Sequence, residues 1–159
     1  NTDSGDSGEP SAVLLQGFES SLTRFMACTD SAFYGWNEDS TVGLEASWNG
    51  ILLQALSSGP QDQTLPVTET LVSVSAMVGE RVNVNWCTDA LEVVPDPLLY
   101  TATSGTIRAE VSTRGTELSD GGVGTVTLTD LVLESEDGHT VTLTSYTVGP
   151  LQIEGAWGG

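Results

Sequence analysis

The alternation of apolar and polar residues is clearest between residues 126 and 148, where it predicts a β-hairpin. Residues 136–138 form a three-residue loop, with Gly138 at the position that requires a positive φ. A two-residue Asp-Gly loop would place Leu133 opposite Thr142, so the pattern favours three residues. The three-residue loop places four apolar residues on one face, in the pairs Leu133 with Val141 and Leu131 with Leu143.

The same register, continued away from the loop, moves the apolar residues to the other face. Its next apolar pairs are Leu128 with Tyr146 and Val126 with Val148. Because both strands change face at the same level, we predict a bend of the whole hairpin near Thr129, Asp130 and Ser145. A bend of this kind is typical of the corner of a sandwich or of a strongly curled barrel.

Short segments with the strand pattern recur along the rest of the chain, separated by turn residues. We expect strands over Ala32–Trp36, Thr41–Trp48, Gly50–Leu56, Thr68–Met77, Arg81–Trp86, Leu98–Thr103, Thr106–Ser112 and Leu151–Trp157, with a polar loop over Ser57–Gln63. Strands do not alternate with helices. The pattern therefore predicts an all-β fold, a single-domain antiparallel β-sandwich or partly closed barrel of about nine strands.

The N-terminal region divides into two parts. Residues 1–10 contain no apolar residue and are rich in Ser, Gly and acids, which is the composition of a flexible acidic leader. The β-domain is expected over residues 11–159. Residues 11–26 fit either helical spacing or one face of a strand, and the leader is either a tether or a donor strand.

The two cysteines, Cys28 and Cys87, have no metal-binding or redox motif around them. We expect a Cys28–Cys87 disulfide, with two buried free thiols as the alternative. A disulfide implies an oxidising compartment, and hence a secreted or cell-surface protein.

The net charge is −18, from 22 acids and four Arg, with no Lys. This balance argues against nucleic acid and anionic membranes as partners, since both are bound through clustered Lys and Arg. No apolar run approaches the roughly 20 residues of a membrane span. The charge favours solubility and affinity for cations.

Catalytic motifs are absent from the sequence, and we expect a protein that is not an enzyme. The single histidine, His139, follows the hairpin loop, so no Ser-His-Asp or Cys-His set can be assembled without it. A pair of catalytic carboxylates remains an alternative, because 22 acids are available.

Two ligand sites are predicted around the first hairpin. Asn37, Glu38 and Asp39 offer oxygen ligands for a structural calcium ion, the only cofactor considered. The aromatic residues Tyr34, Trp36 and Trp48, with Asn37, could form a platform on which a glycan stacks, although packing in the core is the plainer interpretation.

These features predict a structural subunit of an extracellular assembly, such as a filament or surface layer, which self-associates with its own copies. The assembly segment would be Ala12, Val13, Leu14, Leu15 and Phe18, added as a strand to the sheet edge of a neighbour. The alternative is an extracellular carbohydrate- or calcium-binding module of the same fold.

Overall fold

The computed structural model describes residues 16–29 and 31–155. Its elements, in chain order, are η1 (Phe18–Ser21), β1 (Arg24–Cys28), β2 (Ala32–Trp36), β3 (Val42–Trp48), α2 (Ile51–Ser58), β4 (Gln61–Pro66), β5 (Val72–Val78), β6 (Leu98–Thr113), η2 (Leu118–Asp120), β7 (Gly122–Ser135) and β8 (Thr140–Ile153). The all-β prediction is confirmed, with eight strands in one sheet.

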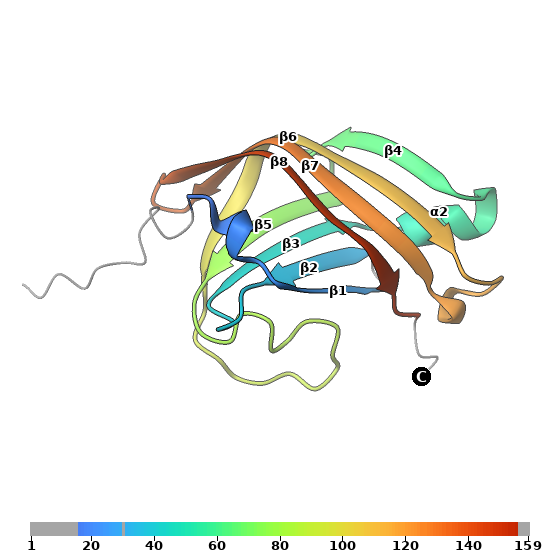
Figure 1. Ribbon diagram of the computed structural model, residues 1–159, viewed down its shortest axis with the longest axis horizontal. Helices are drawn as coiled ribbons and strands as arrows, with labels where there is room; N and C mark the ends of the chain where they lie inside the picture. Colours follow the sequence, from blue (N-terminus) through green and yellow to red (C-terminus); the bar gives the residue numbers. More distant parts are fainter. Residues whose placement is uncertain (1–15, 30, 156–159) are drawn as a thin grey trace, which may run out of the picture.

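The strands lie in two layers that face each other across the core (Figure 1). β1, β2, β3 and β5 form one layer, and β4, β6, β7 and β8 form the other. Four residue pairs between β5 and β6 join the layers on one side. A single parallel bridge, Ala27 with Ile153, joins β1 to β8 on the other. Seven strands are thus paired in a closed circuit, β6-β5-β3-β2-β1-β8-β7 and back to β6, while β4 pairs only with β6. This arrangement has features of both the sandwich and the partly closed barrel.

The 126–148 hairpin has the predicted register. Leu133 pairs with Val141 and Leu131 with Leu143, and Gly138 in the loop has φ 85°. The outer pairs, Leu128 with Tyr146 and Val126 with Val148, are also as expected.

The predicted bend occurs at Asp130, which has φ 51°. On the neighbouring strand β6, Gly105 has φ 111° and lies in a bulge between Ala102 and Thr106. A Cβ atom on Gly105 would lie 2.7 Å from the carbonyl oxygen of Asp130, so the two strands are in close contact at this level. β6 and β7 therefore bend along one line.

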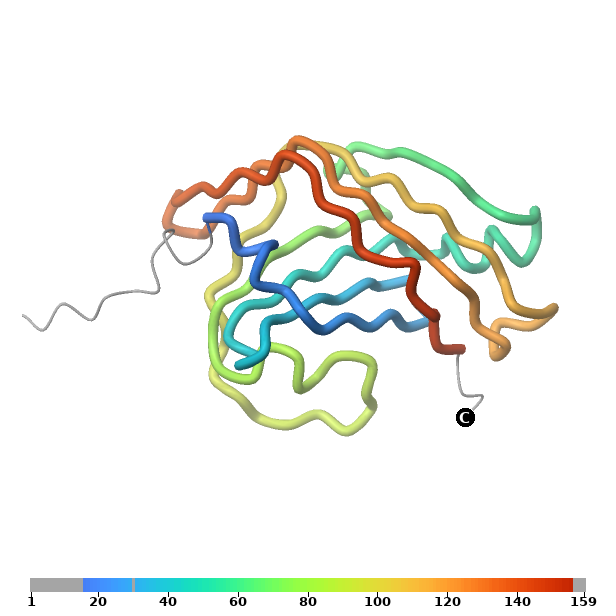
Figure 2. The backbone as a smooth tube through the Cα atoms, viewed as in Figure 1, coloured from blue at the N-terminus to red at the C-terminus, as the bar shows by residue number. Residues whose placement is uncertain are grey.

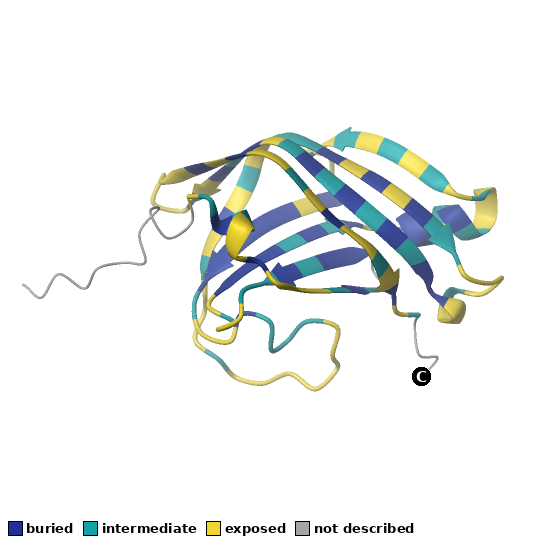
Figure 3. Cartoon of the chain, in the orientation of Figure 1, coloured by how far each residue is buried: buried dark blue, intermediate teal, exposed yellow. Residues whose placement is uncertain are grey.

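The sequence pattern predicted that the two apolar sets of the hairpin would be buried on opposite faces, and this prediction was wrong. Leu128 and Val126 join Leu131 and Leu133 in one core, because the bend at Asp130 restores the inward face after the change of phase. Figure 3 shows this buried interior between the two layers. Its largest buried side chains include Trp48, Tyr100 and Phe33.

Several predicted elements were wrong in type or extent. Residues 51–58 form helix α2 instead of a strand, and the last three residues of the predicted polar loop begin strand β4. The predicted strand over residues 81–86 is a series of turns. The two predicted strands at 98–112 are one bulged strand, β6, and residues 151–153 continue β8.

The ambiguous N-terminal segment is partly described. Residues 18–21 form the 3-10 helix η1, and β1 follows at Arg24. Phe18 and Leu22 are buried in the core. Across the described residues, no helix is long and apolar enough to span a membrane.

Candidate functional site

Strand β8 has an open edge over most of its length. It pairs with β7 from Thr140 to Ile153, but its other neighbour, β1, meets it only at Ile153. Within the described part of the chain, residues 140–148 therefore have a strand partner on one side only. Unpaired backbone groups at a sheet edge are a template for another strand.

The β8 edge lacks the usual protection against such pairing. Natural edge strands are blunted by charged residues, proline or short length. Residues 140–153 contain no charged residue, and the first proline, Pro150, lies beyond the open stretch. Thr140, Thr142 and Thr144 are exposed.

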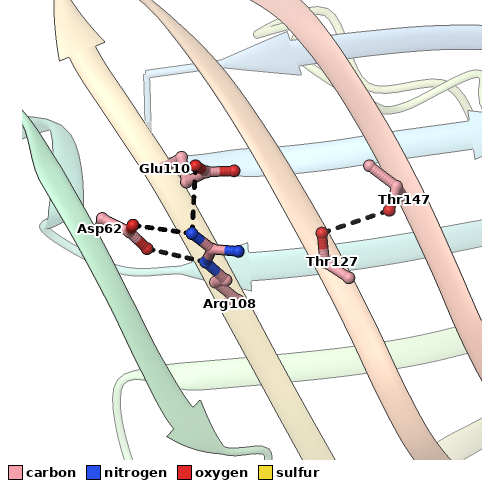
Figure 4. A network of polar contacts seen from close by, with 5 residues as sticks. All are labelled: Asp62, Arg108, Glu110, Thr127 and Thr147. Atoms are coloured by element: carbon pink, nitrogen blue, oxygen red, sulfur yellow. Dashed lines mark hydrogen bonds and ion pairs between the residues drawn. The ribbon is translucent and has the colours of Figure 1, made fainter.

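The other sheet edge, β4, is protected. It is a six-residue strand that ends at Pro66 and carries Asp62 on its exposed face. Arg108 on β6 binds Asp62 through two contacts of 2.8 Å and also reaches Glu110 at 3.4 Å (Figure 4). Side-chain contacts thus join the exposed faces of β4 and β6. Among the described residues, one side-chain hydrogen bond joins β7 and β8, between Thr127 and Thr147 at 3.2 Å.

Of the predicted assembly segment, the structure describes only Phe18. Ala12, Val13, Leu14 and Leu15 lie outside the described residues, while Phe18 is buried in the core of its own chain. Burial, and after it the charge of Glu19 on η1, raise the pKa of Tyr146 on β8.

The predicted aromatic platform is partly occupied by the chain itself. Trp48 is in the core, 1% exposed, and does not reach the surface. Tyr34 and Trp36 lie half-buried on the outer face of β2, but Trp86 stacks on Tyr34 with ring centroids 4.5 Å apart and meets Trp36 edge-on at 5.7 Å. Asn37 closes the β2–β3 turn through hydrogen bonds to Thr41 and Val42. The cluster fastens the loop that carries Trp86 to the sheet.

Next to this cluster, Glu45 is the residue of β3 that pairs with Tyr34. Burial of its carboxyl group raises the pKa of Glu45. Its charge is therefore costly to the folded state at neutral pH.

The loop over residues 79–97 lies against the outer side of the β1–β2–β3 layer (Figure 2). The predicted disulfide between Cys28 and Cys87 holds it there and is confirmed. The side-chain amide of Asn85 bonds the backbone N–H and C=O of Glu92 at 2.8 and 2.9 Å. The loop is thus held both by the disulfide to the sheet and by hydrogen bonds between its own residues.

A cleft of about 670 Å³ opens beside the disulfide. Its apolar lining includes Met26 and Leu53, and its polar lining includes Tyr34, Asn49, Asn85, Thr88, Asp89 and Glu154. The cleft brings together residues from β1, β2, the 79–97 loop, the start of α2 and the end of β8. Its volume is within the range of small-molecule sites.

Two of the three predicted calcium ligands have other partners, and the third, Asp39, is exposed. Glu38 forms an ion pair with Arg24 at 2.7 Å, and Asn37 is used in its turn. No group of three or more potential metal-ligating side chains occurs among the described residues. His139 is exposed beside the hairpin loop.

Sequence reasoning did not find the cleft, because its lining comes from distant segments. The only available signal was the expected disulfide, which places Thr88 and Asp89 near Thr29. The open edge of β8 also depends on the order of strands in the sheet, which the pattern of a single hairpin does not specify.

Comparison of the chain with protein-family models, with curated proteins and with solved structures finds no match.

Proposed function

We propose that the protein is a non-enzymatic structural subunit of an extracellular assembly, a filament or surface layer built from copies of this chain. In this assembly the Ala12–Leu15 segment of one copy adds as a strand to the β8 edge of its neighbour. The observation that carries the proposal is the long, uncharged edge of β8.

The composition of β8 differs from that of the rest of the chain. The protein has 26 charged residues, 22 acidic and four basic, in 159, yet β8 has none across 14 residues. An edge strand that stays exposed to solvent is normally charged to prevent aggregation. The absence of charge supports a role in which the edge is covered by another strand.

The donor segment is suited to that edge. Ala12, Val13, Leu14 and Leu15 are consecutive apolar residues, so an added strand presents apolar side chains on both faces. Gly17 has φ 73° and allows the chain to change direction immediately before Phe18. Phe18 then anchors the donor in its own copy.

An extracellular location is supported by the disulfide, which persists in oxidising compartments. The net charge of −18 disfavours random contacts between copies through like-charge repulsion. Backbone pairing at an uncharged edge gives these copies one specific mode of association.

Two truncations test the proposal. Removal of residues 1–10 deletes the acidic leader and keeps the donor, whereas removal of residues 1–16 deletes both and keeps Gly17. Particle size is measured for each purified chain by light scattering and by electron microscopy. We expect the first chain to assemble like the full chain and the second to be monomeric.

Assemblies of unchanged size after removal of residues 1–16 would contradict the proposal. A full-length chain that is monomeric at every concentration would contradict it too, since the donor would then serve its own copy or none.

A further inference from the structure

Asn49 and Gly50 form the two-residue link between strand β3 and helix α2. Asn49 is exposed, and both residues line the cleft beside the disulfide. Gly50 has φ 85°, and a Cβ atom on it would meet nothing within 4 Å. The peptide bond that joins the two residues is therefore next to solvent and has space around it.

An asparagine that precedes a glycine can react with its own backbone. The backbone nitrogen of the following residue attacks the side-chain amide carbon, and glycine permits this approach because no side chain shields its nitrogen. Asn49 is the only asparagine of the chain that precedes a glycine. Asn83, by comparison, precedes Val84, whose branched side chain crowds the attacking nitrogen.

Two further pairs, Asp120–Gly121 and Asp137–Gly138, have the side-chain spacing for the same cyclisation. In both pairs the folded chain occupies the attacking nitrogen. The first glycine donates its N–H to the carbonyl of Leu118 at 3.1 Å, and the second to that of Ser135 at 2.9 Å. The carboxylate of Asp120 also accepts two backbone N–H groups at 2.9 Å. The fold thus engages at least one reacting group of each pair.

The reacting groups of Asn49 and Gly50 are not engaged in this way. Within the described part of the chain, neither the N–H of Gly50 nor the side-chain amide of Asn49 forms a hydrogen bond. The contacts that position the link use other atoms. The backbone N–H of Asn49 donates to the carbonyl of Leu71 at 2.8 Å, and the carbonyl of Gly50 accepts the N–H of Gln54 at 3.0 Å. Both reacting groups are therefore available.

We propose that Asn49 is a site of spontaneous deamidation. The nitrogen of Gly50 loses its proton and bonds to Cγ of Asn49, and the side-chain amine leaves with that proton as ammonia. Water then opens the resulting cyclic imide and restores the N–H of Gly50. Cleavage of the new bond to Cγ leaves aspartate at position 49, whereas cleavage of the original peptide bond leaves isoaspartate.

The two products change the chain differently. Aspartate adds a negative charge just before α2, whose first turn contains no acidic residue and whose N-cap forms no side-chain hydrogen bond. A negative charge favours a helix N-terminus. Isoaspartate instead lengthens the backbone between Trp48 and Ile51, which are 1% and 0% exposed, so it forces movement in the core. We expect the isoaspartate form to be the less stable of the two.

The test measures the reaction in the folded chain and in the chain unfolded by guanidinium chloride, at the same mildly alkaline pH. Arg-specific cleavage after reduction places Asn49 in peptide 25–81 and Asn83 in peptide 82–108. Mass spectrometry follows deamidation, and isoaspartate content follows cyclisation at Asp120. We expect Asn49 to react at similar rates in both states, and Asp120 about fivefold more slowly in the folded chain, the factor for one hydrogen bond of about 1 kcal/mol.

Variants locate the reaction. Asn49→Gln should abolish the more acidic species that ion-exchange chromatography detects on incubation, because its longer side chain disfavours ring closure. Asn83→Gln should leave that species unchanged. If folding protects Asn49 as much as Asp120, or if the acidic species persists in Asn49→Gln, the proposal is wrong. The reaction needs no partner, so its outcome is independent of the assembly test.

Discussion

Replacing Gly105 by alanine tests the bend in the layer formed by β4, β6, β7 and β8. Gly105 has φ 111°, a conformation that costs a residue with a side chain about 1–3 kcal/mol. The new Cβ would also lie 2.7 Å from the carbonyl oxygen of Asp130 and 2.8 Å from that of Thr129. These are backbone atoms of β7, so relief requires a shift of the strand, which adds about 1–3 kcal/mol.

We therefore expect Gly105→Ala to lower the free energy of unfolding by about 4 kcal/mol. Gly138→Ala is the matched control, because Gly138 also has a positive φ, 85°, but its Cβ would meet nothing within 4 Å. The control should cost about 1–2 kcal/mol, the price of the left-handed conformation alone.

The assay is equilibrium unfolding in urea with the disulfide intact, supported by thermal melting. For a chain of this length, 4 kcal/mol corresponds to a decrease of roughly 8–16 °C in Tm. If Gly105→Ala costs no more than Gly138→Ala, β6 and β7 do not meet at this level and the account of the bend is wrong.

Three further predictions concern the sheet and the loop fastened to it. Because burial raises the pKa of Glu45 above its ordinary value of 4.5, the charge of this carboxylate opposes folding once the pH exceeds 4.5. Glu45→Gln should therefore raise Tm at pH 7, and this gain should vanish as the pH falls below 4.5. A gain that persists at low pH would contradict this. Replacing Cys28 and Cys87 by serine should cost about 4 kcal/mol in urea unfolding, from a separation of 59 residues, and a loss under 1 kcal/mol would refute the estimate. Asn85→Ala should speed proteolytic cleavage near Glu92 while hardly changing Tm, since it removes two hydrogen bonds local to the loop; cleavage at the rate of the unmodified chain would count against that role.

The hairpin and the disulfide could be predicted because each depends on a strong local rule. A three-residue loop with glycine fixes the register, and the register fixes the face of every residue up to Asp130. The change of apolar face near Asp130 could also be predicted from the sequence. The common core of the two apolar sets could not be predicted, because it depends on the positive φ of Asp130, which lies against Gly105 of a different strand.

The errors have physical causes of the same kind. Residues 51–58 are a short apolar run, which periodicity alone does not separate from a strand, and Ile51 and Leu52 are buried on the helix. Strand β4 has polar residues on both faces because it lies at an edge, so it resembled a loop. Trp86 was predicted to lie in a strand. It lies in a loop and stacks on Tyr34, and the disulfide of Cys87 with the distant Cys28 holds that loop to the sheet.

The candidate surfaces were less predictable than the fold. The proposed donor segment could be recognised from its apolar run, but the proposed acceptor depends on the order of strands, in which β1 meets β8 at one residue pair. The proposed platform included Trp48, whose burial follows from the inward face of β3. The cleft depended on Asp89 and Glu154, which are 65 residues apart in the sequence.

The proposed pairing of β8 with the N-terminal segment can be measured directly with a peptide. A fluorescent peptide with the sequence of residues 11–18 is titrated with the chain that lacks residues 1–16, and binding is followed by anisotropy. We expect saturable binding that is abolished by Thr142→Lys on the β8 edge and retained with Thr64→Lys on β4. Absence of binding, or equal loss in the two lysine variants, would contradict it.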